Sequence, residues 1–277
     1  MTANWVDGAT PVLVGSIASD ASCWDFVGVP PHAIRVEYPG HGSRARQPGW
    51  NHEALVDEIA AGVDGPIDVI GVALGAAIAV TLIQHHPGRV RSAMLITGSP
   101  PVDADSLVLE RRRATAEANA DLPQHGGMAV VPDAVLPRWF TPWAVRTDQP
   151  GVRYARERLL ALDAQAWYDI WMAGPASPSL SSDELRRFTG PVTLVGGTND
   201  FAEGLQGLAE LHRIFPNSRF EIMPVSHMAQ LEHPEFVSAA IDRHSAWLPV
   251  GQRVEATIGS SAWPPAEELF EGRRVAR

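Results

Sequence analysis

Residues 69–77, Val-Ile-Gly-Val-Ala-Leu-Gly-Ala-Ala, organise the rest of the chain. In this stretch an apolar run breaks at the turn Gly71-Val72-Ala73-Leu74-Gly75 and resumes as a helix-forming segment. Two glycines placed this way let a strand turn sharply into a helix, and they hold the central residue at strained backbone angles. The stretch therefore predicts a buried strand, a tight turn with Ala73 at its tip, and a helix.

A serine at the centre of this Gly-x-Ser-x-Gly frame would be a nucleophile presented at the tip of the turn. Ala73 offers only a methyl group, which cannot attack a carbonyl carbon. Two interpretations stay open for the stretch by itself: a nucleophile turn that lacks its nucleophile, or an ordinary turn with small residues for close packing. The segments that follow favour the first.

Composition limits the class of protein. The chain has 277 residues, of which 45% are hydrophobic and 19% charged, so it can bury a large core as one domain with an insertion. A net charge of −10 argues against nucleic acid or an anionic membrane as the partner. The single cysteine, Cys23, permits no intrachain disulfide, and no apolar run reaches membrane-spanning length. We expect a cytoplasmic protein without a membrane partner.

Strand and helix patterns alternate along most of the chain. The apolar runs continue without alternation, which is typical of a parallel sheet covered by helices on both faces. The predicted strands are 10–15, 33–37, 67–70, 90–97, 191–196 and 219–223. The predicted class is α/β.

Residues 102–187 break this alternation, because they contain helical segments and no convincing buried strand. Four of the nine tryptophans lie there: Trp139, Trp143, Trp167 and Trp171. We interpret the segment as a helical cap over the carboxyl edge of the sheet. The predicted division is 1–101 for the first part of the core, 102–187 for the cap, 188–250 for the second part of the core and 251–277 for a C-terminal extension.

An aspartate and a histidine complete a constellation with the turn. Asp200 follows a late strand through Gly-Gly-x-x-Asp, and His227 follows the last predicted strand. The order nucleophile, acid, base and the placement of each after a strand fit a base that activates a hydroxyl and an acid that orients the base. Asp103 and Asp105 compete for the acid's role but lack that strand setting.

Two backbone amides are expected to bind the oxyanion of such a reaction. One is the amide of Leu74, which follows the tip and starts a helix whose dipole favours negative charge. The other is expected in the loop after the first strand, and we choose Ile17. Cys23 lacks a neighbouring base, and His85-His86 point to different faces of a helix, so we expect neither a second nucleophile nor a metal site nor a cofactor.

Several segments together resemble the α/β-hydrolase superfamily and, within it, the 3-oxoadipate enol-lactonases and related esterases. The segments resembling that group's motifs are Ser16-Ile17-Ala18-Ser19-Asp20 with Trp24-Asp25, Pro39-Gly40-His41-Gly42, Arg138-Trp139-Phe140-Thr141-Pro142, 191–200 and 226–234. The alanine at position 73, the Phe-Ala-Glu-Gly after Asp200 and the tail beyond Pro249 depart from the group.

The resemblance implies an α/β-hydrolase fold and hydrolysis of a lactone or a small ester. A serine at position 73 would form the acyl-enzyme, His227 would act as base and then acid, and Asp200 would orient it. Ser16 and Trp24 would line the substrate site, and Arg138 would pair with a substrate carboxylate or else bridge the cap to the core. Because the cap must cover the tip of the turn, we also expect Trp139 and Trp143 to contact a ring-bearing or anionic substrate.

Three hypotheses account for Ala73. We favour an introduced replacement of serine, because base, acid and oxyanion loop are all retained. The second is a natural binding protein that uses the pocket without catalysis. The third is a different reaction on the same fold, either hydrolysis of a carbon–carbon bond or a cofactor-independent oxygenation that relies on the His-Asp pair. The oligomeric state is left open.

Overall fold

The computed structural model describes residues 8–177, 179–200, 202–248 and 257–258. Its centre is a seven-stranded sheet in the order β2-β1-β3-β4-β5-β6-β7, with every neighbouring pair parallel. The strands are β1 (Thr10–Val14), β2 (Ile34–Val36), β3 (Ile67–Val72), β4 (Val90–Ile96), β5 (Val192–Gly197), β6 (Ser218–Met223) and β7 (Thr257–Ile258). The predicted parallel sheet is confirmed.

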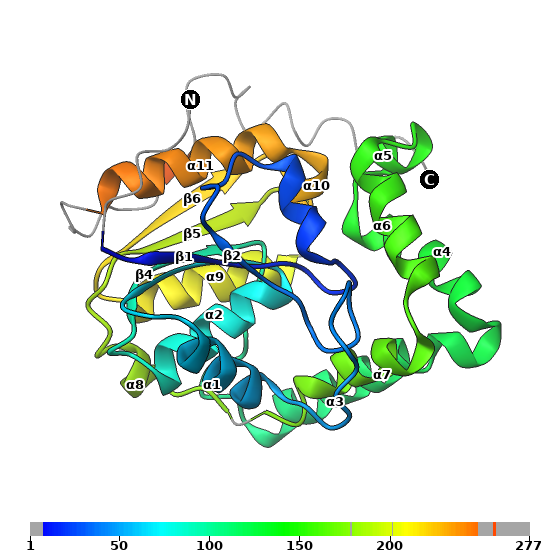
Figure 1. The fold of residues 1–277 in the computed structure, drawn as a ribbon, viewed down its shortest axis with the longest axis horizontal. Coiled ribbons are helices and arrows are strands. Elements are labelled where there is room, and N and C mark those ends of the chain that lie inside the picture. The colour runs from blue at the N-terminus through cyan, green and yellow to red at the C-terminus, as the bar shows by residue number, and fades with distance from the viewer. Residues whose placement is uncertain (1–7, 178, 201, 249–256, 259–277) are drawn as a thin grey trace, which may run out of the picture.

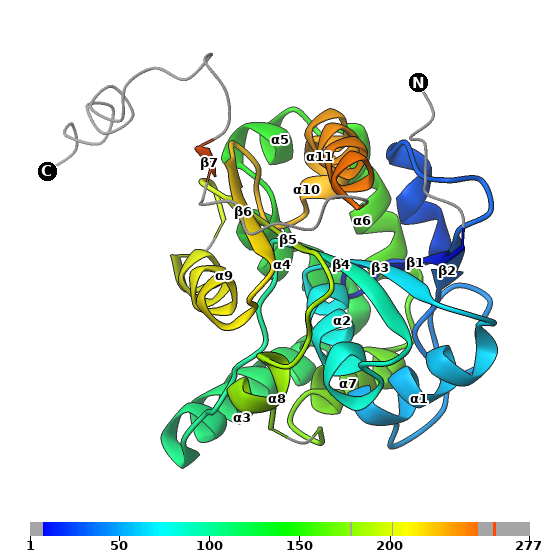
Figure 2. The ribbon, with the colours of Figure 1, turned by 90° about the vertical axis from the view of Figure 1, so that its left-hand side faces the viewer.

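Helices cover both faces of the sheet (Figure 2). On one face lie α1 (His52–Gly62), α2 (Leu74–His85) and α9 (Ala202–Ile214), and on the other lies α11 (Pro234–Trp247). The short helices η1 (Ala21–Phe26) and α10 (Ala229–Glu232) complete the core. The inner strands are covered on both sides, as in β3, where all six residues are buried.

Residues 102–187, which we call the cap segment, connect β4 to β5. Their described part carries only helices, apart from an isolated bridge between Val102 and Leu180. The helices are α3 (Ser106–Ala120), η2 (Leu122–His125), η3 (Gly127–Val130), α4 (Val131–Trp139), α5 (Pro142–Arg146), α6 (Pro150–Ala161), α7 (Ala164–Ala173) and α8 (Ser182–Leu185). Figure 1 shows α4, α5 and α6 beyond the ends to which the arrows of β5 and β6 point.

Ion pairs attach the cap segment to the core. Nη1 of Arg158, on α6, lies 2.8 Å from Oδ2 of Asp20, and the Tyr154 hydroxyl donates to Oδ1 of the same carboxylate at 3.0 Å. Arg46 lies 2.5 Å from Asp169 of α7. The cap helices are therefore fixed against the loops that follow β1 and β2.

The C-terminal part differs from the prediction in one respect. Residues 219–223 were expected to be the last strand, but Thr257 and Ile258 pair in parallel with Glu221 and Ile222 of β6. Apart from these two residues, the predicted extension 251–277 lies outside the described residues. None of the described helices is long and apolar enough to cross a membrane.

Candidate active site

The turn at Ala73 adopts the geometry that its glycines predict. Ala73 has φ 53° and ψ −112°, a conformation that side-chain-bearing residues rarely adopt, and α2 starts at the next residue. A Cβ on Gly71 would lie 2.1 Å from the carbonyl oxygen of Gly75, and one on Gly75 would lie 2.0 Å from that of Val14. Only glycine fits at these two positions, so the sharp turn from β3 into α2 is built into the sequence.

The predicted base and acid are paired. The Nδ1 atom of His227 lies 2.9 Å from Oδ1 of Asp200, whose side chain is 2% exposed, whereas the His227 side chain is 19% exposed. Backbone hydrogen bonds from Thr198 to Met223 and from Asn199 to Val225 join the loops that carry the two residues. A carboxylate in this position orients the imidazole and stabilises its protonated form.

The end of β4 connects this pair to the turn. The carbonyl of Ile96 accepts a hydrogen bond from the Ala73 amide at 2.9 Å, and the Thr97 hydroxyl donates to the carbonyl of His227 at 2.7 Å. Gly98 then packs on Ala73 itself, because a Cβ at position 98 would lie 2.2 Å from the Ala73 carbonyl oxygen. Three consecutive residues at the end of β4 therefore contact both the Ala73 turn and the backbone of His227.

Thr97 is a site residue that the sequence analysis missed. It is fully buried and has φ 47°, a strained conformation for a β-branched residue. Strain of this kind in a buried residue is typical of functional sites. One sequence signal for Thr97 was available, namely a β-branched residue next to Gly98 at the end of a predicted strand. Its hydrogen bond to His227, 130 residues away, could not be read from the sequence.

The loop after β1 is tight and partly polar. The carbonyl of Ser16 accepts hydrogen bonds from the hydroxyl and the amide of Ser19, and Gln230 donates to the Ser16 hydroxyl at 3.0 Å. Within the described part of the chain, the amide of Ile17 donates no hydrogen bond. The amide of Leu74 is the first of α2, where helix geometry supplies no acceptor. Neither predicted oxyanion donor thus has an acceptor in the described part of the chain.

The predicted substrate-contact residues fall into two groups. Trp24 and Trp139 are buried, and the indole nitrogen of Trp24 has no hydrogen-bond partner among the described residues. Trp143 is 55% exposed on α5. Arg138 is exposed and donates a hydrogen bond of 3.0 Å to Oδ1 of Asn119, which lies on α3 of the same cap segment.

A buried carboxylate links the cap segment to the loop of His227. Glu232, whose side chain is 1% exposed, accepts hydrogen bonds from the Ser226 hydroxyl at 2.5 Å and from the Thr141 amide at 3.0 Å, and a further one from the Thr141 hydroxyl. The amide of Met228 also donates to the carbonyl of Trp139 at 3.1 Å. The position of the cap corner at Thr141 is thus coupled to the residues on either side of the base.

The competing candidates have structural partners. Asp103 accepts a hydrogen bond from the Ser182 amide, and Asp105 caps the start of α3. Cys23 is buried, and burial raises the pKa of its thiol to about 12. His85 and His86 pair with two separate acids on α1, and the described residues form no group of ligands that could hold a metal ion.

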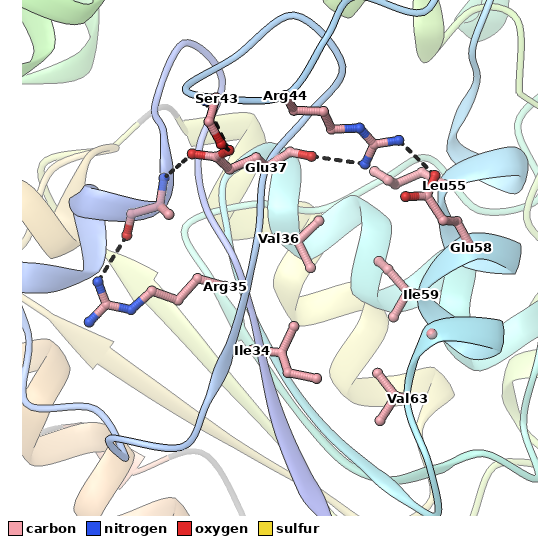
Figure 3. A pocket seen from close by; sticks show the side chains of 12 residues that line it. Ile34, Arg35, Val36, Glu37, Ser43, Arg44, Leu55, Glu58, Ile59 and Val63 are labelled. Atoms are coloured by element: carbon pink, nitrogen blue, oxygen red, sulfur yellow. Dashed lines mark hydrogen bonds and ion pairs between the residues drawn. The ribbon is translucent and has the colours of Figure 1, made fainter.

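A surface groove of about 490 Å³ lies elsewhere, between the edge strand β2 and α1 (Figure 3). Its polar residues satisfy one another, since Arg44 lies 2.6 Å from Glu58 and Ser43 donates to Glu37 at 2.8 Å. Neither Ala73 nor His227 lines it. We therefore place the candidate active site at the Ala73 turn and not in this groove.

Comparison with known proteins identifies the family of the chain. The sequence profile of the alpha/beta hydrolase family matches residues 12–240. The chain belongs to this family. The pimeloyl-[acyl-carrier protein] methyl ester esterase of Chromobacterium violaceum is 26% identical to the chain over 217 residues, which cover 76% of the chain and 82% of that protein. The esterase of the same description from Neisseria meningitidis serogroup A is 37% identical over 70 residues, covering 25% of the chain and only 22% of that relative's length.

Solved structures show the same fold. The enol-lactonase from Burkholderia xenovorans LB400 superposes with a TM-score of 0.72 at 21% identity. The superposition covers 87% of this chain and 92% of the enol-lactonase chain. The structure of MenH from S. aureus gives a TM-score of 0.75 at 17% identity, covering 90% of this chain and 97% of its own. The predicted resemblance to the α/β-hydrolase superfamily is confirmed.

Proposed function

We propose that this chain is the framework of a hydrolase for small carboxylic esters or lactones in which position 73 lacks its nucleophile. The observation that carries the proposal is the His227–Asp200 pair, held beside the strained Ala73 turn by residues 96–98. The esterase and enol-lactonase similarities support the ester and lactone classes. A small molecule is the proposed partner, and no cofactor takes part.

With a serine at position 73 the reaction has a defined course. The hydroxyl oxygen attacks the carbonyl carbon while Nε2 of His227 takes the hydroxyl proton, and Asp200 holds the Nδ1 proton. The amides of Ile17 and Leu74 stabilise the resulting oxyanion. The leaving alcohol receives the proton from His227, and a water molecule, activated in the same way, then releases the acid from the acyl-enzyme.

With Ala73 the first of these bonds cannot form. Base, acid and oxyanion donors still surround the reacting position, so the chain in this form binds a substrate without acylation. The apolar rings of Trp24 and Trp139 are the proposed walls of the site. Arg138 could contact a substrate carboxylate only after leaving Asn119. Trp143 could contact a substrate only by turning inward from the surface of α5.

The test is to restore the nucleophile. Ala73→Ser should gain turnover against a panel of methyl esters, aryl esters and lactones, and the same variant with His227→Ala should lose it. The unchanged chain is the reference for background hydrolysis. If Ala73→Ser is inert toward the whole panel while its circular dichroism and melting temperature match those of the unchanged chain, the proposed function is wrong.

A further inference from the structure

Arg112 is a cation of the cap segment without a carboxylate partner among the described residues. Its Nη2 donates only to the neutral carbonyl oxygen of Ser99, at 3.3 Å. Arg112 is an exposed residue, although partial burial of its guanidinium lowers the pKa of that group. The guanidinium is thus partly desolvated by its neighbours, and the described ones supply no counter-charge.

Arg112 lies within reach of the reacting position. Ser99 directly follows Gly98, which packs on the carbonyl of Ala73. Backbone dimensions therefore place the guanidinium at most about 13 Å from the Cα atom of Ala73. A short aliphatic chain spans that distance.

The packing of α3 on α7 places Arg112 near His52. The two helices run antiparallel. Trp167, near the start of α7, donates to the carbonyl of Asn119, near the end of α3, at 2.8 Å, and Val102, which precedes α3, bridges Leu180, which follows α7. Arg112 is seven residues before Asn119, and Gly174 is seven residues after Trp167. Each interval is about two helical turns, so we infer that Arg112 lies opposite Gly174. A Cβ on Gly174 would lie 3.8 Å from Nε2 of His52.

The electrostatics agree with this placement. Burial, together with the smaller effect of the charge of Arg112, lowers the pKa of His52 to about 4. His52 is therefore neutral at pH 7. It can offer a ring N–H to a ligand without adding a second positive charge.

Buried polar nitrogens without a hydrogen-bond partner surround the same place. In the described part of the chain they are Nε2 of His52 and the indole nitrogens of Trp50 and Trp171. Trp50 lies beside His52, with 6.3 Å between ring centroids, and Trp171 is on α7 one turn before Gly174. An indole nitrogen can only donate, so a ligand that fits here must bring acceptors. A buried donor without a partner is destabilising, and a ligand that accepts its hydrogen bond removes that cost.

We propose that Arg112, with the ring nitrogens of His52 and Trp171, forms a subsite for a carboxylate at the non-reacting end of the substrate. A carboxylate accepts hydrogen bonds, and its single negative charge would pair with the positive charge of Arg112. The substrate class is therefore a monoanionic ester or lactone. The reaction part of this inference rests on the proposed function, but the binding part does not.

Binding is tested with the unchanged chain, because Ala73 leaves the ligand intact. Monomethyl esters of linear dicarboxylic acids from succinate to suberate are titrated by calorimetry against the uncharged dimethyl esters of the same acids. At least one monoester should bind ten-fold or more tightly than its dimethyl ester. Arg112→Gln should weaken monoester binding by about 10–100-fold, the usual worth of a charge-assisted hydrogen bond. Arg112→Lys should retain part of it, and Trp171→Phe should cost several-fold.

Arg113→Gln is the matched control, because Arg113 pairs with Glu117 on the exposed side of the same helix and should leave binding unchanged. Equal affinity for monoesters and dimethyl esters, or a preference that survives Arg112→Gln, would overturn the subsite. Turnover by Ala73→Ser separates the two proposals. Activity without anion preference removes the subsite and keeps the hydrolase, whereas Arg112-dependent binding in an inert Ala73→Ser variant removes the hydrolase and keeps the subsite.

Discussion

Gly98 packs so closely on Ala73 that a Cβ at position 98 would lie 2.2 Å from the Ala73 carbonyl oxygen and 2.8 Å from its Cα. The end of β4 is thus fitted to the strained turn at the end of β3. A backbone atom cannot move aside as a flexible side chain can, so any larger residue at position 98 has to displace the turn.

Gly98→Ala should therefore destabilise the fold by about 2 kcal/mol or more in urea unfolding, the usual cost of overpacking. Gly62→Ala is the matched control, because Gly62 ends α1 and a Cβ there would meet no atom within 4 Å. The control should be neutral or slightly stabilising. Equal stability of the two variants would contradict the fit between Gly98 and Ala73.

Thr97→Val removes one hydroxyl and keeps the shape of the side chain. The carbonyl of His227 then loses the hydrogen bond of 2.7 Å, which should cost about 1–2 kcal/mol of stability. In an Ala73→Ser background we expect kcat to fall about ten-fold with little change in KM, because the position of the base is altered and not the binding of substrate. Thr97→Ser should recover most of the loss. A Thr97→Val variant with full kcat would show that Thr97 does not position His227.

Much of this fold was readable because its signals are local. Continuous apolar runs predicted parallel strands, and the glycines at 71 and 75 predicted the turn that the structure shows. The pairing of Asp200 with His227 also agrees with the sequence, since each follows a strand and the carboxyl ends of parallel strands share one edge.

The contacts between distant segments were not readable in this way. Glu232 lies 91 residues from Thr141, and the hydrogen bonds that join them depend on how the cap segment sits on the core. Arg138 was considered for the substrate carboxylate, whereas its side chain donates to Asn119, and the arginine that we propose for that role is Arg112. Choosing among arginines required the packing of α3 against α7, which no periodicity encodes.

His244 should make stability depend on pH. It is buried between Thr193 and Ser92, and burial, with the charges of Arg219 and Arg91, lowers its pKa from an ordinary value of 6.5 to about 3. Between those two values the unfolded chain binds a proton that the folded chain does not, so stability is retained above pH 6.5 and lost as the pH falls toward 3.

The slope is at most about 1.4 kcal/mol per pH unit for one proton. Urea unfolding at pH 7 and pH 5 should show the folded state weaker at pH 5, and His244→Gln should reduce the difference. His32→Gln, at an exposed position, should leave it unchanged. A pH dependence that is the same in His244→Gln and in the unchanged chain would place its origin elsewhere.

Removal of the base or the acid should be costly once the nucleophile is present. In an Ala73→Ser background, His227→Ala should lower kcat by about four orders of magnitude or more, because base and nucleophile act as a unit. Asp200→Asn should cost as much or less, about 10³–10⁴-fold, since the amide holds the imidazole in the wrong tautomer. Steady-state kinetics with one ester decide both. Nearly full turnover without His227 would mean that another group is the base.

The central claim is that this fold lacks only a nucleophile at position 73, and covalent labelling tests it most directly. A fluorophosphonate reacts when an activated serine oxygen attacks phosphorus and fluoride leaves. Intact mass and peptide mapping should show one adduct on Ala73→Ser, located at position 73, and none on the unchanged chain. The adduct should form far more slowly when His227 is also replaced by alanine. A folded Ala73→Ser variant that is not labelled, or that is labelled equally fast without His227, would contradict the account.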